Sequence, residues 1–349
     1  MNSEDKPIIA ITMGDPAGIG SEVIVKALES NHISDICEPI VIGDYQVMHR
    51  ALLDSYGIDC TQRLGSLENI DELEKTSYHI PVLDLKNVLD SEFTYGVVKK
   101  EYGLAAGEYI KTATQLALDK KIDAVVTAPI HKQSFREAGY PYPGHTEMFT
   151  SLCKAKNTSL MLVKDSFRVV HVTMHSALKD VPKLITHSKV LDCIQVAYEG
   201  MLAIGILNPR IGVCGLNPHA GESGQFGLED ENEILPAVLE AKKSGMDIEG
   251  PLPADTIFPM LKGGRFDIVV AMYHDQGGIP MKLLSFDWDD VNSRWGDVHG
   301  VNVTLGLPII RTSVAHGTAF EVTGKNIASP GSMIDAIEMA VKMVRFKRK

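Results

Sequence analysis

Short apolar runs alternate with stretches of helical spacing along the chain, and this alternation restricts the fold more than any other feature. The runs at 8–13, 122–129 and 266–271 each have the length of a buried strand and end in glycine, proline or polar residues. Parallel strands need a long crossover between them, and a helix is its usual form. The alternation therefore predicts an α/β fold with a mostly parallel sheet covered by helices.

Composition narrows the class of protein. The 349 residues suffice for two domains or one large α/β unit, and 44% hydrophobic with 23% charged residues is ordinary for a globular protein. A net charge of −11 argues against a nucleic-acid partner, because a phosphate backbone needs a basic surface. The start of the chain lacks a signal-peptide pattern and no apolar run reaches membrane-spanning length, so we expect a cytoplasmic protein with no membrane partner.

The cysteines point to a reducing compartment. Their number is odd, their spacing is wide, and no Cys-x-x-Cys pair occurs among them. This pattern favours neither a disulfide framework nor a structural zinc ribbon. The five cysteines are Cys37, Cys60, Cys153, Cys193 and Cys214.

Histidines follow three of the apolar runs. His175 closes the stretch that begins at Phe167, His219 follows the run that begins at Arg210, and His274 follows the run at 266–271. Ligands bind at the carboxyl ends of strands in open α/β sheets, so these imidazoles are candidates for one site. Three neutral imidazoles commonly hold a divalent transition metal with a position left open to substrate. Three unconnected structural histidines would give the same spacing, and the residues alone leave both interpretations open.

Other polar clusters stand at predicted junctions of strand and helix. Gly14–Gly20 is a glycine-rich turn into a helix whose N-terminus favours an anion, but its spacing fits neither a dinucleotide fingerprint nor a Walker motif. The cluster at 130–133 and the pair His145 and Thr146 can hold a phosphate or carboxylate, although the pair can equally begin a helix. Asp255 follows a rigid proline-rich loop and fits a helix cap as well as a catalytic acid.

Eight ordered strings resemble the 4-hydroxythreonine-4-phosphate dehydrogenase family, or PdxA family. They are GDPAGIG, TAPIHK, GHTE, GLNPHAGE, GPLPADT, MYHDQG, VNVTLGLPIIRTS and HGTA, and they span the chain from Gly14 to the last helix. The resemblance implies two α/β/α domains of the isocitrate and isopropylmalate dehydrogenase type, with the active site in the cleft between them. We place the cofactor domain at 1–145 and 315–349, and the domain of metal, substrate and dimer interface at 146–314.

The resemblance also implies roles for individual residues. His175, His219 and His274 match three metal ligands, one of them contributed across the interface of a homodimer. The other matched positions fall into three groups: substrate contacts at His145, Thr146, Lys282, Asn302 and Arg311; cofactor contacts at His316, Gly317, Thr318 and Ala319; and proton transfer by Asp275, Lys282 or Asp255.

The implied activity uses NAD and one divalent metal ion per site, which is zinc, cobalt or a similar ion, or magnesium. The ion would stabilise the alkoxide of the substrate as hydride leaves and then polarise the new ketone as carbon dioxide departs. Lys282 and Arg311 suit a phosphate and a carboxylate. HGTA followed by PGS resembles the adenosine-binding loop of the isocitrate dehydrogenases, which implies NAD binding without a Rossmann fingerprint.

One segment departs from the vitamin-B6 members of the family. Residues 283–300 form a markedly longer stretch that carries both tryptophans, and it resembles the branch that acts on D-threonate or D-erythronate 4-phosphate. We therefore expect oxidation and decarboxylation of such an acid to glycerone phosphate and carbon dioxide. The alternative substrate is 4-hydroxythreonine 4-phosphate of pyridoxal phosphate biosynthesis, and the alternative class is a metal-dependent phosphoester hydrolase. A non-catalytic binding protein would have lost site residues, and none of the matched positions is lost.

Overall fold

A computed structural model describes residues 6–57, 62–76, 78–88, 93–291 and 294–349. The chain forms two compact units: unit 1 comprises 1–155, 296–301 and 307–349, and unit 2 comprises 156–295 and 302–306. These limits differ from the division expected at 145/146 and 314/315. Cys60 lies outside the described residues, and the other four cysteines are free thiols.

Unit 1 holds a sheet whose pairings are parallel. Its strands lie in the order β3-β4-β2-β1-β5-β14. The inner strands are buried on both faces, as expected for continuous apolar runs in a parallel sheet. Their bounds are β1 (Ile8–Thr12), β2 (Glu38–Gly43), β3 (Leu64–Leu67), β4 (Ile80–Asp84), β5 (Ala124–Thr127) and β14 (Ile310–Val314).

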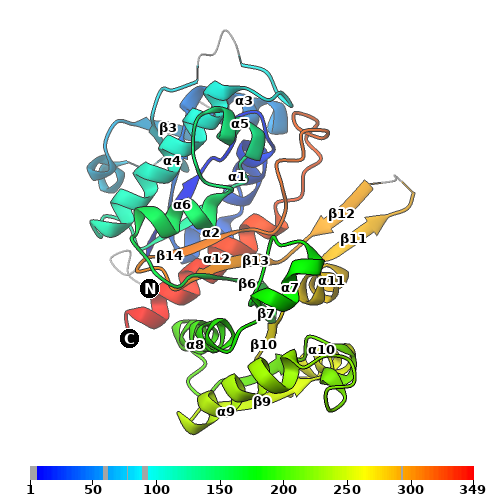
Figure 1. The fold of residues 1–349 in the computed structure, drawn as a ribbon. Helices are drawn as coiled ribbons and strands as arrows, with labels where there is room; N and C mark the ends of the chain where they lie inside the picture. Colours follow the sequence, from blue (N-terminus) through cyan, green and yellow to red (C-terminus); the bar gives the residue numbers. More distant parts are fainter. Residues whose placement is uncertain (1–5, 58–61, 77, 89–92, 292–293) are drawn as a thin grey trace. The chain divides into compact units, whose positions relative to one another are not determined.

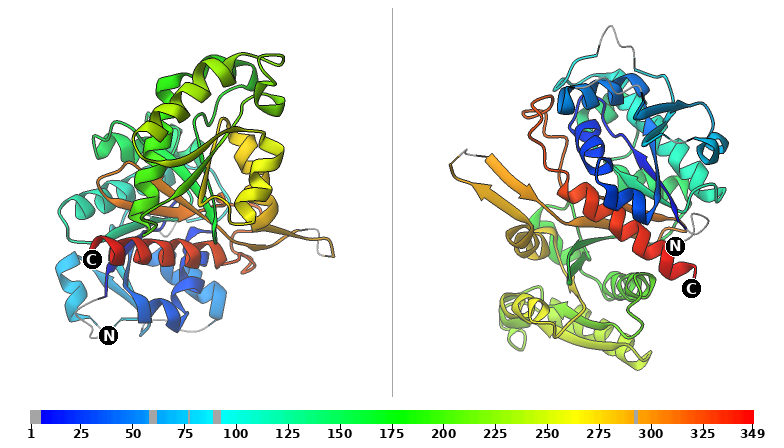
Figure 2. Two further views of the ribbon diagram at one scale, coloured as in Figure 1. Left: turned by 90° about the horizontal axis from the view of Figure 1, so that it is seen from below. Right: turned by 180° about the vertical axis from the view of Figure 1, so that it is seen from behind.

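The helices of unit 1 pack in two groups around this sheet (Figure 1). The first group is α1 (Gly20–Leu28), α2 (Asn31–Ile36), α3 (Tyr45–Tyr56) and α12 (Gly331–Lys347); the second is α4 (Lys100–Leu118), α5 (Lys132–Glu137) and α6 (His145–Leu152). Figure 2 shows α12 running along the sheet, where it contacts β14 and β5, whereas α4 contacts β1 and β2. A short 3-10 helix at Ile70–Lys75 joins β3 to β4.

Local signals explain where these helices begin and end. The Asp44 side chain accepts hydrogen bonds from the backbone amides of Gln46 and Val47 and so caps α3. Gly57 ends the same helix with a left-handed φ of 61°, a conformation that glycine adopts without strain. Local chemistry therefore determines both ends of α3.

Unit 2 is built on β6 (Ser159–Lys164), β7 (Phe167–His171), β8 (Arg210–Cys214), β9 (Asp247–Leu252), β10 (Ile268–Ala271) and β13 (Val301–Leu305). The order is β13-β6-β7-β10-β8-β9, in which β6 runs antiparallel to β7 while β7, β10, β8 and β9 are parallel neighbours. Its helices are α7 (Val181–Leu184), α8 (His187–Ala203), α9 (Leu235–Lys243), α10 (Ala254–Lys262) and α11 (His274–Ser285), with short turns of helix at Leu178–Asp180, Pro218–Gly221 and Asp230–Ile234.

One hydrophobic core fixes α10 and α11 against the strands of unit 2. Phe258 and Leu261 of α10 and Met281 of α11 pack with Val169 of β7 and Val269 of β10. On the other side, α8 and α9 contact each other, and α8 contacts β10, β7 and β6. The start of α11 is thereby held at the end of β10.

The expected α/β class with a mostly parallel sheet is confirmed, with three local differences. The short edge strand β3 was not predicted from the sequence. The strand β13 was not expected, and part of the segment 283–300 forms a two-stranded sheet of β11 (Phe286–Asp289) and β12 (Arg294–Val298).

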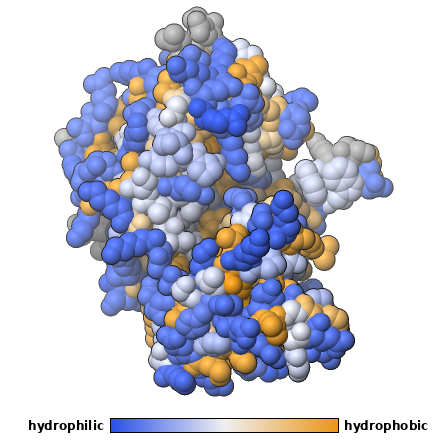
Figure 3. Space-filling view, in the orientation of Figure 1, coloured by the Kyte–Doolittle hydropathy of each residue, from blue (hydrophilic) through white to orange (hydrophobic). Residues whose placement is uncertain are grey.

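One face of the molecule is mainly polar. Figure 3 shows a largely hydrophilic face on which apolar side chains are scattered. Within the described ranges, no helix has the length and apolar character needed to cross a membrane.

Candidate functional site

The three candidate metal histidines follow three neighbouring parallel strands of unit 2. His175 follows β7, His274 is the first residue of α11 after β10, and His219 lies in the turn after β8. Since β10 pairs with both β7 and β8, the strands end at one edge of the sheet. The topology therefore brings the three loops to the same edge, as their position after apolar runs predicts.

Side-chain hydrogen bonds tie these strand ends together. Thr173 donates its hydroxyl to the carbonyl of Met272 at 2.8 Å. The Gln276 side chain accepts from the amide of Met272 at 2.6 Å and donates to the carbonyl of Gly215 at 2.8 Å. Gln276 is buried and was not among the candidate residues, although it stands inside the MYHDQG string. It links the end of β10 to the end of β8.

His175 and His274 are brought together. Their ring centroids lie 5.9 Å apart, and the Nδ1 atom of His274 lies 2.6 Å from a carboxylate oxygen of Asp275. A carboxylate at Nδ1 holds a proton there and leaves the Nε2 lone pair for a metal ion. Asp275 thus acts on the orientation and the tautomer of His274.

His219 stands in a differently shaped loop. Its φ of 53° is left-handed, as are those of Ala220, Glu222 and Ser223. The buried Asp230 carboxylate accepts from the amides of Leu216 and Asn217 and holds this backbone, whose conformation costs free energy. The His219 ring lies 6.4 Å from that of Phe226. Among the described residues, no three His, Cys, Asp or Glu side chains stand close enough to hold a metal ion.

A fourth histidine, His171, lies beside this pair and was not a candidate. It is 3% exposed, neither ring nitrogen has a hydrogen-bond partner, and its ring stacks on that of His274 at 6.3 Å. Burial, helped by the neighbouring charge of His274, lowers the pKa of His171 to about 4, so its ring is neutral at pH 7. Its place within an apolar run gave no signal that it lies beside the candidate site.

The first turn of α11 lies directly on His171. A Cβ atom at Gly277 would stand 2.5 Å from the Nε2 atom of His171 and 2.5 Å from a methyl carbon of Val169. Only glycine permits this approach, which sets the height of His274 and Asp275 above the strand. At the adjacent Gly278, the nearest atom to an added Cβ is 3.7 Å away.

The other proton-transfer candidates are exposed. Lys282 lies in the last turn of α11, with its Nζ atom 5.7 Å from the centroid of the Phe286 ring. Asp255 lies in the first turn of α10, where Pro253 occupies the cap position, so Asp255 is not the N-cap residue. Asn302 is the second residue of β13 and is half-buried.

In unit 1, Arg311 and His145 come together from β14 and α6. Arg311 is 2% exposed, donates to the Thr127 hydroxyl at 2.5 Å, and holds its guanidinium 5.4 Å from the centre of the Phe149 ring. Burial lowers the pKa of Arg311, and the charge of Glu147 partly offsets this. Such a desolvated cation favours an anionic ligand.

His145 complements this cation because it is neutral. Burial, followed by the charge of Arg311, lowers its pKa well below the usual value. Its Nε2 atom is buried without a hydrogen-bond partner. Thr146, the next residue of α6, accepts a hydrogen bond from the Thr150 hydroxyl through its carbonyl.

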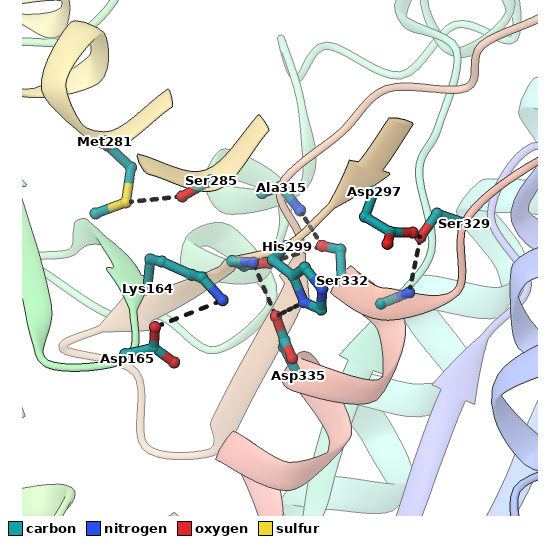
Figure 4. Close-up of polar contacts among 12 residues, drawn as sticks. Lys164, Asp165, Met281, Ser285, Asp297, His299, Ala315, Ser329, Ser332 and Asp335 are labelled. Atoms are coloured by element: carbon teal, nitrogen blue, oxygen red, sulfur yellow. Dashed lines mark hydrogen bonds and ion pairs between the residues drawn. The ribbon is translucent and has the colours of Figure 1, made fainter. Parts of the chain in front are cut away.

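The candidate cofactor loop, 316–319, packs on the glycine-rich turn of unit 1. The Ile19 amide donates to the Thr318 carbonyl at 3.1 Å, and an added Cβ at Gly18 would stand 3.1 Å from Thr318. Figure 4 shows how the loop is anchored: the amide of Ala315 donates to the Ser332 hydroxyl at 2.9 Å, in the first turn of α12.

His316, Gly317 and Ala319 differ in their surroundings. The Nδ1 atom of His316 lies 3.0 Å from the Gly317 carbonyl, its Nε2 atom is buried without a partner, and burial lowers its pKa. Gly317 is exposed, with nothing within 4 Å of an added Cβ, and Ala319 has a left-handed φ of 44°. The loop therefore exposes its backbone at Gly317, whereas the Nε2 atom of His316 is buried.

A small cleft lies beside the same turn and loop. It is lined by Gly18, Ser21, Glu22, Ala51, Asp54, Ser55, Tyr95, Thr323, Gly324 and Asn326. None of the four candidate cofactor residues lines it, and no sequence pattern marked Asp54 or Tyr95, which come from other segments. One oxygen of the Glu22 carboxylate accepts hydrogen bonds from the Lys26 ammonium and the Ala328 amide, both at 2.8 Å.

Asp15, in the glycine-rich turn, is a buried carboxyl group. It is 1% exposed, one oxygen accepts from the Ala17 amide at 2.9 Å, and the other has no hydrogen-bond partner. Burial raises the pKa of Asp15 to about 6, against the opposing effect of nearby donors. The turn beside the cleft therefore contains a carboxyl group that changes charge near neutral pH.

Comparison with known proteins finds the same relatives for sequence and structure. A family model described as "Pyridoxal phosphate biosynthetic protein PdxA" matches residues 35–340. D-threonate 4-phosphate dehydrogenase of Cupriavidus necator is 42% identical over 342 residues, covering 98% of each chain. 4-hydroxythreonine-4-phosphate dehydrogenase of Trichlorobacter lovleyi is 42% identical over 344 residues, covering 97% of this chain and 98% of that protein.

A solved structure agrees. The crystal structure of a 4-hydroxythreonine-4-phosphate dehydrogenase from Burkholderia phymatum matches with a TM-score of 0.79 at 42% identity, covering 97% of this chain and 98% of that one. Relatives named for D-threonate 4-phosphate and for 4-hydroxythreonine 4-phosphate are thus both 42% identical to this chain.

The two glycines of α11 give a matched pair of variants. Gly277→Ala should lower the free energy of unfolding by about 1–3 kcal/mol, because the new methyl group collides with His171 and Val169. Gly278→Ala should raise it by up to about 1 kcal/mol, because alanine favours a helix and the new methyl group meets only His274, at an ordinary contact distance of 3.7 Å. Urea unfolding measures both. Equal changes in the two variants would show that α11 does not seat on His171.

Asp15 should make stability fall as the pH rises. The unfolded carboxyl ionises near its usual pKa of 3.8, whereas the folded one keeps its proton up to about 6. Stability from this group is complete below pH 3.8 and is lost between 3.8 and 6, by at most about 3 kcal/mol. Urea unfolding from pH 4 to 7 should show a smaller decline in Asp15→Asn than in the parent. Parallel curves for the two proteins would contradict the shift.

Proposed function

The chain belongs to the PdxA family of dehydrogenases, and on that premise we propose that it oxidises and decarboxylates a four-carbon, 4-phosphorylated hydroxy acid. The preferred substrate is D-threonate or D-erythronate 4-phosphate, and the products are glycerone phosphate and carbon dioxide. The observation that carries the proposal is the His175–His274 pair, 5.9 Å apart, with Asp275 fixing the tautomer of His274.

A divalent metal ion fits this pair. Two imidazoles from neighbouring strand ends, one of them oriented by a carboxylate, are donors that zinc, cobalt and similar ions prefer. His219 does not join them within the described chain, so we propose that the third imidazole comes from a second copy in a homodimer. The ion, when bound, supplies Lewis-acid stabilisation to the substrate oxygen that gains negative charge.

The chain's own residues bind the substrate and move protons. Arg311 offers a desolvated guanidinium to one anionic group, and Lys282 offers an ammonium to another. Oxidation at the third carbon places a ketone β to the carboxylate, which then leaves as carbon dioxide. The second carbon takes up a proton, and Asp275, Lys282 and Asp255 remain the candidate donors and acceptors.

NAD fits unit 1. The loop at 316–319 is fixed on the glycine-rich turn, and the adjacent cleft presents the Glu22 and Asp54 carboxylates and backbone at Gly18 and Gly324. These groups suit the hydroxyls and the ring of an adenosine. The nicotinamide end, when bound, supplies the hydride acceptor.

The alternative substrate is 4-hydroxythreonine 4-phosphate, which one group of equally similar relatives carries in its name. The two acids differ at the second carbon, which bears a hydroxyl in one and an ammonium in the other. A site that pairs a buried ammonium rejects a neutral hydroxyl strongly, because the partner is left unpaired. A phosphoester hydrolase is disfavoured because the named relatives are dehydrogenases.

Substrate preference is tested with the purified enzyme. The kcat/KM for D-threonate or D-erythronate 4-phosphate should exceed that for 4-hydroxythreonine 4-phosphate, with NADH formation followed by absorbance. A preference for the amino acid would assign the chain to the alternative reaction. Release of inorganic phosphate without NADH would support the hydrolase instead.

The shared metal site is tested by mixing subunits. His175→Ala and His219→Ala should each lose bound metal and activity, because each removes one donor. The surface variant His32→Ala, which loses only a bond to Glu338, serves as the control. Co-expression of the two inactive variants should restore about a quarter of wild-type activity. Half of the dimers then contain one subunit of each kind, and one of the two sites in such a dimer has all its histidines. No restoration would show that His219 acts within its own subunit.

A further inference from the structure

The hairpin of β11 and β12 carries an aromatic cluster that the proposed function does not use. It begins directly after α11 and is drawn in orange in Figure 1. Both tryptophans of the chain lie in it, at Trp288 and Trp295, together with Phe286. Aromatic and aspartate residues alternate from Phe286 to Asp289, with the period of two that a strand requires.

The three rings contact one another edge to face. Phe286 and Trp295 lie with centroids 5.6 Å apart at 78°, and Trp288 and Trp295 lie 5.2 Å apart at 82°. Edge-to-face pairs are a favoured aromatic geometry because positive ring edges meet negative ring faces. Trp295 is the central member, since it contacts both other rings across the two strands. The Phe286 ring is thereby fixed by the opposite strand.

Phe286 in turn contacts Lys282. The Nζ atom of Lys282 lies 5.7 Å from the centroid of Phe286, within the range of a cation–π interaction. The neighbour of Lys282 in the helix, Met281, is buried and holds the backbone at this point. The Ser285 hydroxyl donates to the Met281 sulfur at 3.5 Å, as Figure 4 shows. The helix is therefore fixed, while the exposed lysine side chain takes its direction from the aromatic ring.

An aromatic ring orients this ammonium without neutralising it. In the described part of the chain Lys282 makes no ion pair, although Asp287 and Asp290 stand nearby in the sequence. A carboxylate partner would compensate the lysine charge and compete with an anionic ligand, whereas a ring attracts the cation and leaves its charge available. The geometry points to Phe286, held by Trp295, as a positioning residue that directs the Lys282 ammonium toward the phosphate or carboxylate of the substrate. This inference rests on the substrate role proposed for Lys282.

Kinetics of Phe286 variants test the inference. Phe286→Leu removes the ring but keeps an apolar side chain, and it should raise KM for the phosphorylated acid by about two- to fivefold, the range for an exposed cation–π contact. The kcat and the KM for NAD should stay within about twofold of wild type, and Phe286→Tyr should restore the wild-type KM. Trp295→Leu should act like Phe286→Leu, whereas Trp288→Phe, which keeps a ring against Trp295, is the matched control.

A double variant separates positioning from a structural role. In a Lys282→Gln background, Phe286→Leu should have no further effect on KM, because the charge that it directs is gone. Tryptophan emission of Phe286→Leu and Phe286→Tyr checks that the hairpin persists, since both tryptophans lie in it. The inference would be overturned if Phe286→Leu raised KM as much in the Lys282→Gln background as in the wild type. It would also be overturned if Phe286→Leu left KM unchanged in the presence of Lys282. Wild-type KM in Lys282→Gln itself would instead overturn the substrate role of Lys282.

Discussion

The close approach of helix α11 to strand β7 is the constraint on which the polar groups of unit 2 depend. The helix touches the strand where Gly277 has no side chain, and the neutral ring of His171 fills the space beneath. Since α11 begins at His274, that contact sets the position of His274, Asp275 and Lys282 together. Burying the two ring nitrogens of His171 without hydrogen-bond partners costs stability. An apolar side chain at this position would not have this cost.

Much of this arrangement was predictable because it follows from backbone rules. Apolar runs such as 8–13 and 266–271 read as buried parallel strands, and polar residues directly after them had to lie at one edge of a sheet. Both ends of helix α3 follow from local chemistry, because Asp44 caps its first turn and Gly57 ends it in a left-handed conformation. The α/β class therefore needed no knowledge of tertiary contacts.

Other features depend on contacts that spacing does not encode. Strand β3 has only four residues at a sheet edge, so its apolar signal is short. The spacing did not single out His171, because a single sequence does not tell which face of a buried strand meets a helix. His219 follows a strand as predicted. The left-handed backbone around it turns its ring toward Phe226, and hydrogen bonds to Asp230 hold this backbone. The hairpin at β11 and β12 read as a loop because its alternation covers few residues.

The divided architecture of unit 1 has a consequence for synthesis on the ribosome. Strand β5 is complete at Thr127, but its partner β14 ends only at Val314, and α12, which covers both, is the last helix of the chain. During translation β5 therefore presents an unpaired parallel edge while more than a hundred further residues are made. Unpaired edges attract other strands, so a fragment of this chain that stops before β14 should aggregate more readily than a chain that contains it.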